Sequence, residues 1–189
     1  MALDRTTNRK QQILETLAKI LENPKREKIT TASLAAKLDV SEAALYRHFA
    51  NKAQMFEGLI EFIEASIFGV INKITTDETD GAKQAQLIIT MLLKFAEKNP
   101  GMTRVLTGDA LVNEEEWLQI RINQLYDRIE ASLKQSIRIA ETSTGVKADA
   151  EAQANLMICY VIGRFNQYAK SGFKRKPSEF IHNQLQILA

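Results

Sequence analysis

Residues 30–52 read Thr-Thr-Ala-Ser-Leu-Ala-Ala-Lys-Leu-Asp-Val-Ser-Glu-Ala-Ala-Leu-Tyr-Arg-His-Phe-Ala-Asn-Lys. This stretch predicts two short helices, over 31–38 and about 42–48, because Thr30 or Thr31 and then Ser41 are good N-cap residues. Asp39-Val40 makes the turn between them. Two capped helices joined by such a turn are typical of a helix-turn-helix, whose second helix enters the major groove of DNA.

The side chains of the second helix suit a DNA surface. Ser41, Ala43 and Ala44 are short and permit close approach, whereas Tyr46, Arg47 and His48 can reach phosphates or base edges. The apolar residues between the two helices form a small core: Leu34, Leu38, Val40 and Leu45. An αα-hairpin with a solvated polar face is the alternative, and a generic helix-turn-helix pattern leaves it open.

Outside this stretch the chain also predicts helices only. Apolar residues recur at helical spacing, and polar, Gly or Pro positions separate the segments. The expected helices cover 6–22, 51–74, 82–98, 101–107, 109–140 (one helix or a pair), 148–170 and from Pro177-Ser178 to the end, with a loop at 75–81 and a linker at 141–147. Glu114–Glu116 is expected to be a loop or a helix start.

Composition limits the possible functions. The net charge of +2 divides into ten basic and six acidic residues over 1–52 and fifteen against seventeen over 53–189. The basic part is therefore the part expected to bind DNA. With two His, one Cys and no recognisable catalytic motif, we expect no enzyme, no cofactor and no metal site. No apolar run is long enough to predict a membrane span or a signal peptide.

The string Leu45-Tyr46-Arg47-His48-Phe49-x-Asn51-Lys52, after Thr30-Thr31-x-x-Leu34-Ala35, resembles the DNA-binding domain of the TetR family. The resemblance implies an all-α, TetR-like fold: a three-helix DNA-binding domain at 1–50 and a larger helical dimerisation and partner domain at 51–189. It also implies phosphate contacts for Tyr46, His48 and Lys52, with Thr30 at the DNA backbone. The full expected DNA-binding set is Arg5, Arg9, Thr30, Thr31, Ser41, Glu42, Ala43, Ala44, Tyr46, Arg47, His48 and Lys52.

Motifs beyond the DNA-binding head resemble the nucleoid-occlusion branch of that family. They include Leu59-Ile60-Glu61-Phe62-Ile63-Glu64, Asn99-Pro100-Gly101, Arg104-Val105-Leu106-Thr107-Gly108 and Arg121-Ile122-Asn123-Gln124-Leu125. This resemblance implies a cytoplasmic, nucleoid-associated homodimer that binds palindromic sites in double-stranded DNA. On DNA it would engage the tubulin-like division protein FtsZ and block ring assembly over the chromosome. The residues expected to bind FtsZ are Phe62, Met91, Lys94, Lys98 and Asn99.

Two questions stay open at the level of sequence. A ligand-responsive TetR-type repressor is the alternative function, and Trp117, Phe95, Tyr126 and Tyr160 could line its pocket or simply form core. The family resemblance implies that the dimer forms through the last two long helices. The apolar residues there could serve either that interface or the core of one protomer: Met157, Tyr160, Val161, Gly163, Arg164, Phe165, Phe180, Ile181, Leu185 and Leu188.

Overall fold

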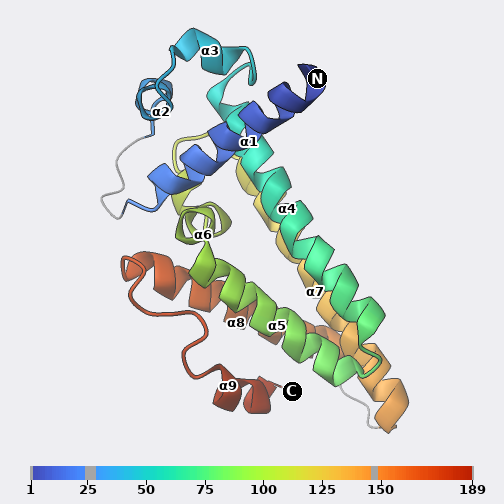
Figure 1. Ribbon diagram of the computed structural model, residues 1–189. Coiled ribbons are helices and arrows are strands. Elements are labelled where there is room, and N and C mark those ends of the chain that lie inside the picture. The colour runs from blue at the N-terminus through green and yellow to red at the C-terminus, as the bar shows by residue number, and fades with distance from the viewer. Residues whose placement is uncertain (1, 24–28, 146–148, 189) are drawn as a thin grey trace.

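The computed structural model describes residues 2–23, 29–145 and 149–188, with side chains from Arg9 onward (Figure 1). Over these residues the chain is helical and contains no strand. The elements are α1 (Ala2–Leu21), α2 (Thr31–Lys37), α3 (Glu42–Tyr46), α4 (Lys52–Asp77), α5 (Gly81–Lys98), α6 (Pro100–Leu106), the 3₁₀ turn η1 (Asp109–Leu111), α7 (Glu116–Thr144), α8 (Ala150–Lys170) and α9 (Ile181–Leu188). The all-helical fold class expected from the sequence is confirmed.

The head of the molecule contains α1, α2, α3 and the start of α4. Capping side chains set the helix starts: the oxygens of Thr30, Ser41 and Asn51 accept hydrogen bonds from the backbone amides of Ser33, Ala44 and Gln54. Asp39 makes the turn between α2 and α3 with a φ of 52°, a left-handed conformation that Asp tolerates better than most residues. The core of this head is buried and apolar: Ile13, Leu17, Leu34, Ala35, Leu45 and Phe49.

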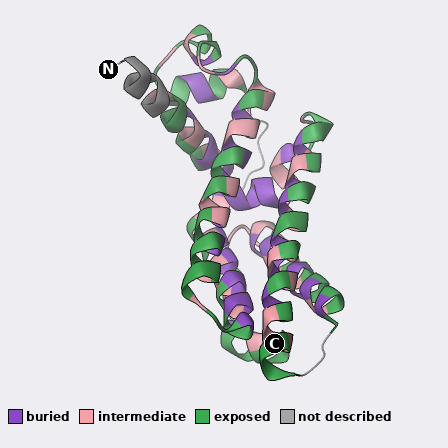
Figure 2. Cartoon of the chain, turned by 90° about the vertical axis from the view of Figure 1, so that its right-hand side faces the viewer, coloured by how far each residue is buried: buried purple, intermediate pink, exposed green. Residues whose placement is uncertain are grey.

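The body is a helical bundle in which α7 packs along both α4 and α8, and α5 packs on α7 and α8 (Figure 1). Buried residues follow the inward faces of these long helices, and exposed residues follow the outward faces (Figure 2). Helices α5 and α7 approach closely at Gly81, where an added Cβ would lie 2.1 Å from the Ser136 carbonyl oxygen. Asp80 caps α5 at this point with hydrogen bonds to two backbone amides.

Helix α6 joins the head to the body. Gly101 lies against the C-terminal half of α1, so close that an added Cβ would be 1.9 Å from the Ala18 carbonyl oxygen. Arg104, which is buried, donates to the carbonyl oxygens of Leu21 and Asn23 at 3.2 Å and pairs with Asp109 at 2.8 Å. The end of α1 is therefore fixed to α6, which follows directly after α5.

Three helices extend further than the sequence predicted: α1 begins at Ala2 and not at residue 6, and α4 and α7 end later than expected. The expected loop at 75–81 is wrong for its first residues, because α4 continues to Asp77; the expected linker at 141–147 is wrong for 141–144, because α7 continues to Thr144. In both places Thr and Ser hydroxyls donate to backbone carbonyls three or four residues earlier, so these polar side chains find their partners within the helix. Residues 146 and 147 of the expected linker lie outside the described residues.

The last helix begins later than Pro177-Ser178. Ser178 is held by the Glu97 carboxylate of α5 through its backbone amide (2.8 Å) and its hydroxyl (2.6 Å). Arg164 donates to the carbonyl oxygens of residues 176, 177 and 179. Phe180 then takes a φ of 66°, and α9 starts at Ile181. With only eight residues, α9 is not the long helix that the family resemblance implied.

Several apolar side chains lie on the surface rather than in the core. Ile120 of α7, for example, is half exposed. Conversely, Met157, Val161 and Phe165 of α8 are buried inside the protomer, so they belong to its core and not to a dimer face.

No helix within the described residues is long and apolar enough to cross a membrane.

Candidate functional site

Helix α3 presents one polar face to solvent at the end of the head. Ser41, Glu42 and Ala43 at its start are exposed, as are Tyr46 and Arg47 at its end. Leu45 points the other way and is buried with Phe49. The outward face carries small and polar groups on a helix that projects from the molecule, which is the arrangement required to enter a major groove.

A chain of hydrogen bonds connects α2 to α3 on this face. The hydroxyl of Thr31 donates to the Glu42 carboxylate, and the Tyr46 hydroxyl donates to Thr31 Oγ1 over 3.4 Å. Thr30, one residue earlier, forms a capping box with Ser33. The structure therefore brings together four of the expected DNA-binding residues, at the tip of the head.

Lys52 lies at the first turn of α4 and is already paired. Its ammonium group forms a short ion pair with Glu114, and the side chains of the two residues are 22% and 13% exposed. The same ammonium lies 5.6 Å from the centroid of the Phe56 ring. Glu114 is a partner that the sequence did not predict, since nothing in the pattern links two positions 62 residues apart.

His48 and the N-terminal arm have different surroundings. In the described part of the chain, Nδ1 of His48 is buried and has no hydrogen-bond partner. Arg9 donates to Gln12 at 2.8 Å, and the Lys10 ammonium lies 5.5 Å from the Phe49 ring, so both belong to the surface of the head. The side chain of Arg5 lies outside the described residues.

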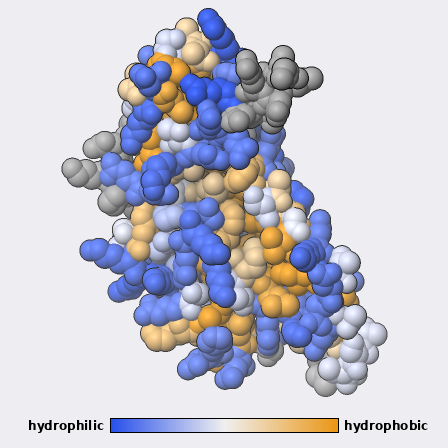
Figure 3. All heavy atoms as spheres, viewed as in Figure 1, coloured by the Kyte–Doolittle hydropathy of each residue, from blue (hydrophilic) through white to orange (hydrophobic). Residues whose placement is uncertain are grey.

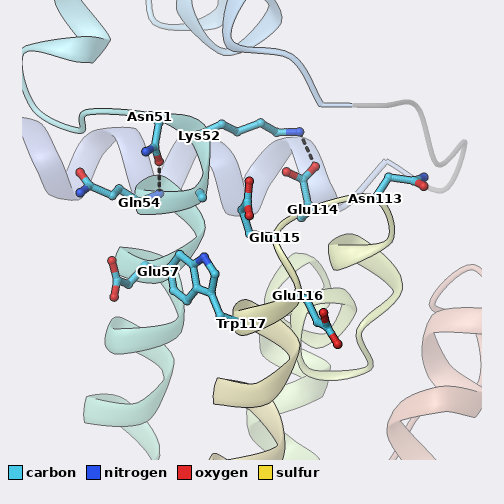
Figure 4. A pocket seen from close by; sticks show the side chains of 10 residues that line it. Asn51, Lys52, Gln54, Glu57, Asn113, Glu114, Glu115, Glu116 and Trp117 are labelled. Carbon is cyan, nitrogen blue, oxygen red and sulfur yellow. Dashed lines mark hydrogen bonds and ion pairs between the residues drawn. The ribbon is translucent and has the colours of Figure 1, made fainter.

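A cleft of about 710 Å³ opens between the start of α4 and the segment before α7 (Figure 4). Its lining contains the Lys52–Glu114 pair and three further carboxylates, from Glu57, Glu115 and Glu116. Trp117 lines one side of it. The two tyrosines that could have lined a ligand pocket have hydrogen-bond partners outside this cleft. The Tyr126 hydroxyl donates to the Leu106 carbonyl oxygen, and the Tyr160 hydroxyl donates to Gln184.

The expected partner residues lie along α4 and α5. Phe62 is 41% exposed, so it is a surface residue and not the core residue that its apolar spacing would give. Val70 and Leu87 are exposed to a similar degree, and Met91 is partly exposed. Figure 3 shows hydrophobic atoms gathered between α4 and α5 on this face. We call Phe62, Val70, Leu87 and Met91 the apolar patch.

Two lysines accompany the apolar patch. Lys94 and Lys98 are exposed on α5, one helical turn apart, as the sequence predicted. Asn99 ends the helix and donates its side-chain amide to the Phe95 carbonyl oxygen at 2.8 Å, which fixes its orientation. Exposed apolar side chains on two neighbouring helices, with two ammonium groups on one of them, are the kinds of group that can hold an amphipathic peptide that carries carboxylates.

Models of two protein families match this chain. Residues 27–59 match the bacterial regulatory proteins of the tetR family, and residues 80–189 match a Tetracyclin repressor-like C-terminal domain of SlmA type. The first match covers α2, α3 and the start of α4, and the second covers α5 to the end of the chain. Together they follow the head and body seen in the structure.

Curated relatives extend over nearly the whole chain. It is 53% identical over 180 residues to the nucleoid occlusion factor SlmA of Alteromonas mediterranea, covering 94% of this chain and 92% of that one. It is 47% identical over 190 residues to SlmA of Shewanella oneidensis, covering 100% and 96%. The identity includes the body as well as the head.

Solved structures share the fold at low sequence identity. A TetR transcription regulator from Haloarcula marismortui superposes with a TM-score of 0.81 at 16% identity, covering 97% of each chain. FadR of Bacillus subtilis, solved with stearoyl-CoA, gives 0.76 at 14% identity, covering 94% of this chain and 96% of that one. At this identity the likeness supports the fold alone.

Proposed function

Because the chain belongs to the TetR family and, within it, to the SlmA nucleoid occlusion factors, we propose that it binds FtsZ while it is held on DNA as a dimer. It is a DNA-binding nucleoid occlusion factor. The observation that supports this function is the 47–53% identity that continues through the body, where we place the partner surface. The division of the chain near residue 50 into a DNA-binding and a partner domain belongs to the same proposal.

For DNA, we assign the outward face of α3 to the major groove and its flanks to the phosphate backbone. Ser41, Ala43 and Ala44 allow the helix to approach the bases, and Tyr46 and Arg47 are exposed beside them. Thr30 precedes α2 as its N-cap, where its hydroxyl can meet a phosphate. Thr31, whose hydroxyl donates to Glu42, contributes to the DNA surface by orienting that carboxylate. His48 and Lys52 complete the backbone contacts, and the arm with Arg5 and Arg9 follows the adjoining groove.

For FtsZ, we assign the apolar patch with Lys94, Lys98 and Asn99. The exposed side chain of Phe62 and the partly exposed side chain of Met91 would receive apolar residues of the bound segment. Lys94 and Lys98 would pair with its carboxylates. Both lie near the C-terminal end of α5, just before α6, which contacts α1 of the head.

The dimer is proposed to form through the exposed face of α8. Leu156 is 55% exposed there, Cys159 is exposed, and Gly163 has open space around its Cα. These positions are three or four residues apart, so they form one stripe along the helix. A two-fold axis through this stripe would place two heads on one palindromic site. The dimer would act in the cytoplasm, on the nucleoid.

One experiment separates this function from a local repressor with a small-molecule ligand. The protein is mixed with a DNA duplex that it binds, and purified FtsZ with GTP is then added. We expect DNA-bound protein to reduce the FtsZ pelleted by centrifugation, while acyl-CoA esters and other small metabolites leave DNA binding unchanged. Release of the DNA by such a metabolite, with no effect on FtsZ, would instead establish the ligand-responsive repressor.

A matched pair of variants tests the docking surface. Lys98→Glu should weaken FtsZ binding about tenfold or more, because it replaces an attractive charge at the patch with a repulsive one. Arg138→Glu, a similar charge reversal on exposed α7, should bind FtsZ like the wild type. DNA affinity should stay the same in both. Equal loss of FtsZ binding and DNA binding in Lys98→Glu would indicate misfolding. Lys98 would then no longer be assigned to the FtsZ-docking surface.

A further inference from the structure

An acidic side chain stands at the point of the molecule that faces DNA. Glu42 is the first residue of α3, follows the capping residue Ser41, and is exposed. The next residues, Ala43 and Ala44, are too small to keep it away from a bound duplex. A carboxylate cannot bind a phosphate, so its place on this face requires another explanation.

The structure holds this carboxylate in one orientation. Thr31 of α2 donates its hydroxyl to Oε2 of Glu42, and Tyr46 donates in turn to Thr31. Glu42 and Tyr46 are four residues apart on α3, so their side chains leave the helix on the same side. A carboxylate has about four acceptor sites, and the Thr31 hydroxyl uses one of them. The remaining sites stay available to an outside donor.

The edges of the bases in the major groove offer few groups that could fill those sites. Guanine presents only acceptors there, and thymine an acceptor and a methyl group; both would leave the carboxylate without a donor. Cytosine presents its N4 amino group, which is the usual partner of Glu and Asp. Adenine presents N6 beside the acceptor N7, a pair that matches an amide better than a carboxylate.

We propose that Glu42 selects a C·G base pair in each half-site by accepting a hydrogen bond from cytosine N4, and that Thr31 orients it for this task. The proposal rests on the assignment of α3 to the major groove and adds to it the identity of one base. Glu42 is then a specificity-determining residue, and Thr31 is a positioning residue that acts through it.

The test is a selection of binding sites from a pool of random DNA duplexes, followed by affinity measurements on matched duplexes. The wild type should enrich sites with cytosine at one fixed position of each half-site. Glu42→Gln should change the preference at that position from cytosine to adenine, because an amide pairs with N6 and N7. The ratio of affinities for the C·G and A·T duplexes should fall by about tenfold or more, while the other positions keep their preferences.

Two further variants make the outcome decisive. Thr31→Val keeps the carboxylate but removes the hydroxyl that orients it, so discrimination at the same position should decrease with no change of preferred base. Glu15→Gln removes a similar charge from exposed α1 and should leave every preference unchanged. Circular dichroism checks that each variant is folded.

Two results would overturn the proposal. One is an unchanged preference in Glu42→Gln; the other is equal loss of affinity on all duplexes, which would make Glu42 only a brace between α2 and α3. A wild type that enriches no sequence at all would be a different failure. It would contradict sequence-specific binding by α3, and with it the proposed function.

Discussion

Gly101 has no room for a side chain between α6 and α1. An added Cβ would lie 1.9 Å from the Ala18 carbonyl oxygen of α1, so Gly101→Ala must push α6 away from the head. We expect it to lower the free energy of unfolding by about 2 kcal/mol or more. The matched control is Gly69→Ala on α4, which has open space and should stabilise the protein by up to about 1 kcal/mol.

Urea unfolding followed by circular dichroism measures both variants. Equal stability of Gly101→Ala and the wild type would contradict the close contact between α6 and α1. The DNA affinity of Gly101→Ala gives a second reading, because displacement of α6 also displaces the end of α1, to which Arg104 is bonded.

Tyr126 predicts a loss of stability at high pH. Burial raises the pKa of its hydroxyl above the usual value of about 10, and the group donates to the Leu106 carbonyl oxygen. Above pH 10 the unfolded chain releases this proton but the folded protein keeps it. Stability therefore falls as pH rises, by up to about 1.4 kcal/mol per pH unit for one group.

The measurement is the free energy of unfolding between pH 8 and 11.5 for the wild type and Tyr126→Phe. Burial also raises the pKa of Tyr160 and Tyr168. The unfolding free energy of the variant should therefore still fall with pH, but less steeply than that of the wild type. At pH 8 it should be less stable by about 1 kcal/mol, because one hydrogen bond is missing. Identical slopes would show that Tyr126 ionises as easily in the folded state as in the unfolded one.

At the scale of elements, the first turn of α4 is bonded to the segment before α7. Lys52 reaches across from the head to Glu114, and both side chains are largely covered. If Lys52 also binds a DNA phosphate, as the family resemblance implies, then Glu114 competes with DNA for its ammonium group. Glu114→Gln should therefore strengthen DNA binding about fivefold at moderate salt.

A titration of labelled duplex at several salt concentrations measures this effect. Glu116→Gln, in the same cleft but outside the ion pair, controls for the general loss of negative charge. Lys52→Ala should weaken binding, and adding Glu114→Gln to it should bring no further gain. A gain of the same size on the Lys52→Ala background would show that Glu114 repels DNA without acting through Lys52.

The starts of α2, α3 and α4 could be predicted from local signals in the sequence, whereas the start of α9 could not. Thr30, Ser41 and Asn51 are local caps whose partners lie three residues away, so their signal is complete within a short window. The late start of α9 depends on Glu97 and Arg164, which reach it from other helices. Contacts between segments far apart in the sequence leave no local sequence pattern from which they could be predicted.

The candidate site divides in the same way. The position of Lys94 and Lys98 on one face of α5 follows from helical spacing and was predictable. The exposure of Phe62 could not be predicted from the pattern of α4. Phe62 belongs to the same helical series of apolar positions as residues that are buried, such as Ile63. Which apolar positions are covered depends on how α7 packs against α4, and the sequence of α4 does not contain that information.

At the scale of the whole molecule, the two proposed binding surfaces are linked by a short physical path. Lys98 and Asn99 end α5, α6 begins at Pro100, and Arg104 of α6 holds the end of α1. A change in the position of α1 on binding DNA would move α6 and the adjoining end of α5. Helix α6 therefore connects the basic head to the docking surface.

The dimer interface gives the prediction that belongs to the whole molecule. A glutamate in place of Leu156, on the exposed face of α8, would enter the interface twice because of the two-fold axis. The dissociation constant of the dimer should rise by about a hundredfold or more in sedimentation experiments, and affinity for a palindromic duplex should fall with it. Ile120→Glu is the control, since Ile120 is about equally exposed but lies on α7. A dimer that survives Leu156→Glu and dissociates in Ile120→Glu would place the two-fold axis at α7 instead, because a charge weakens association only where it becomes buried.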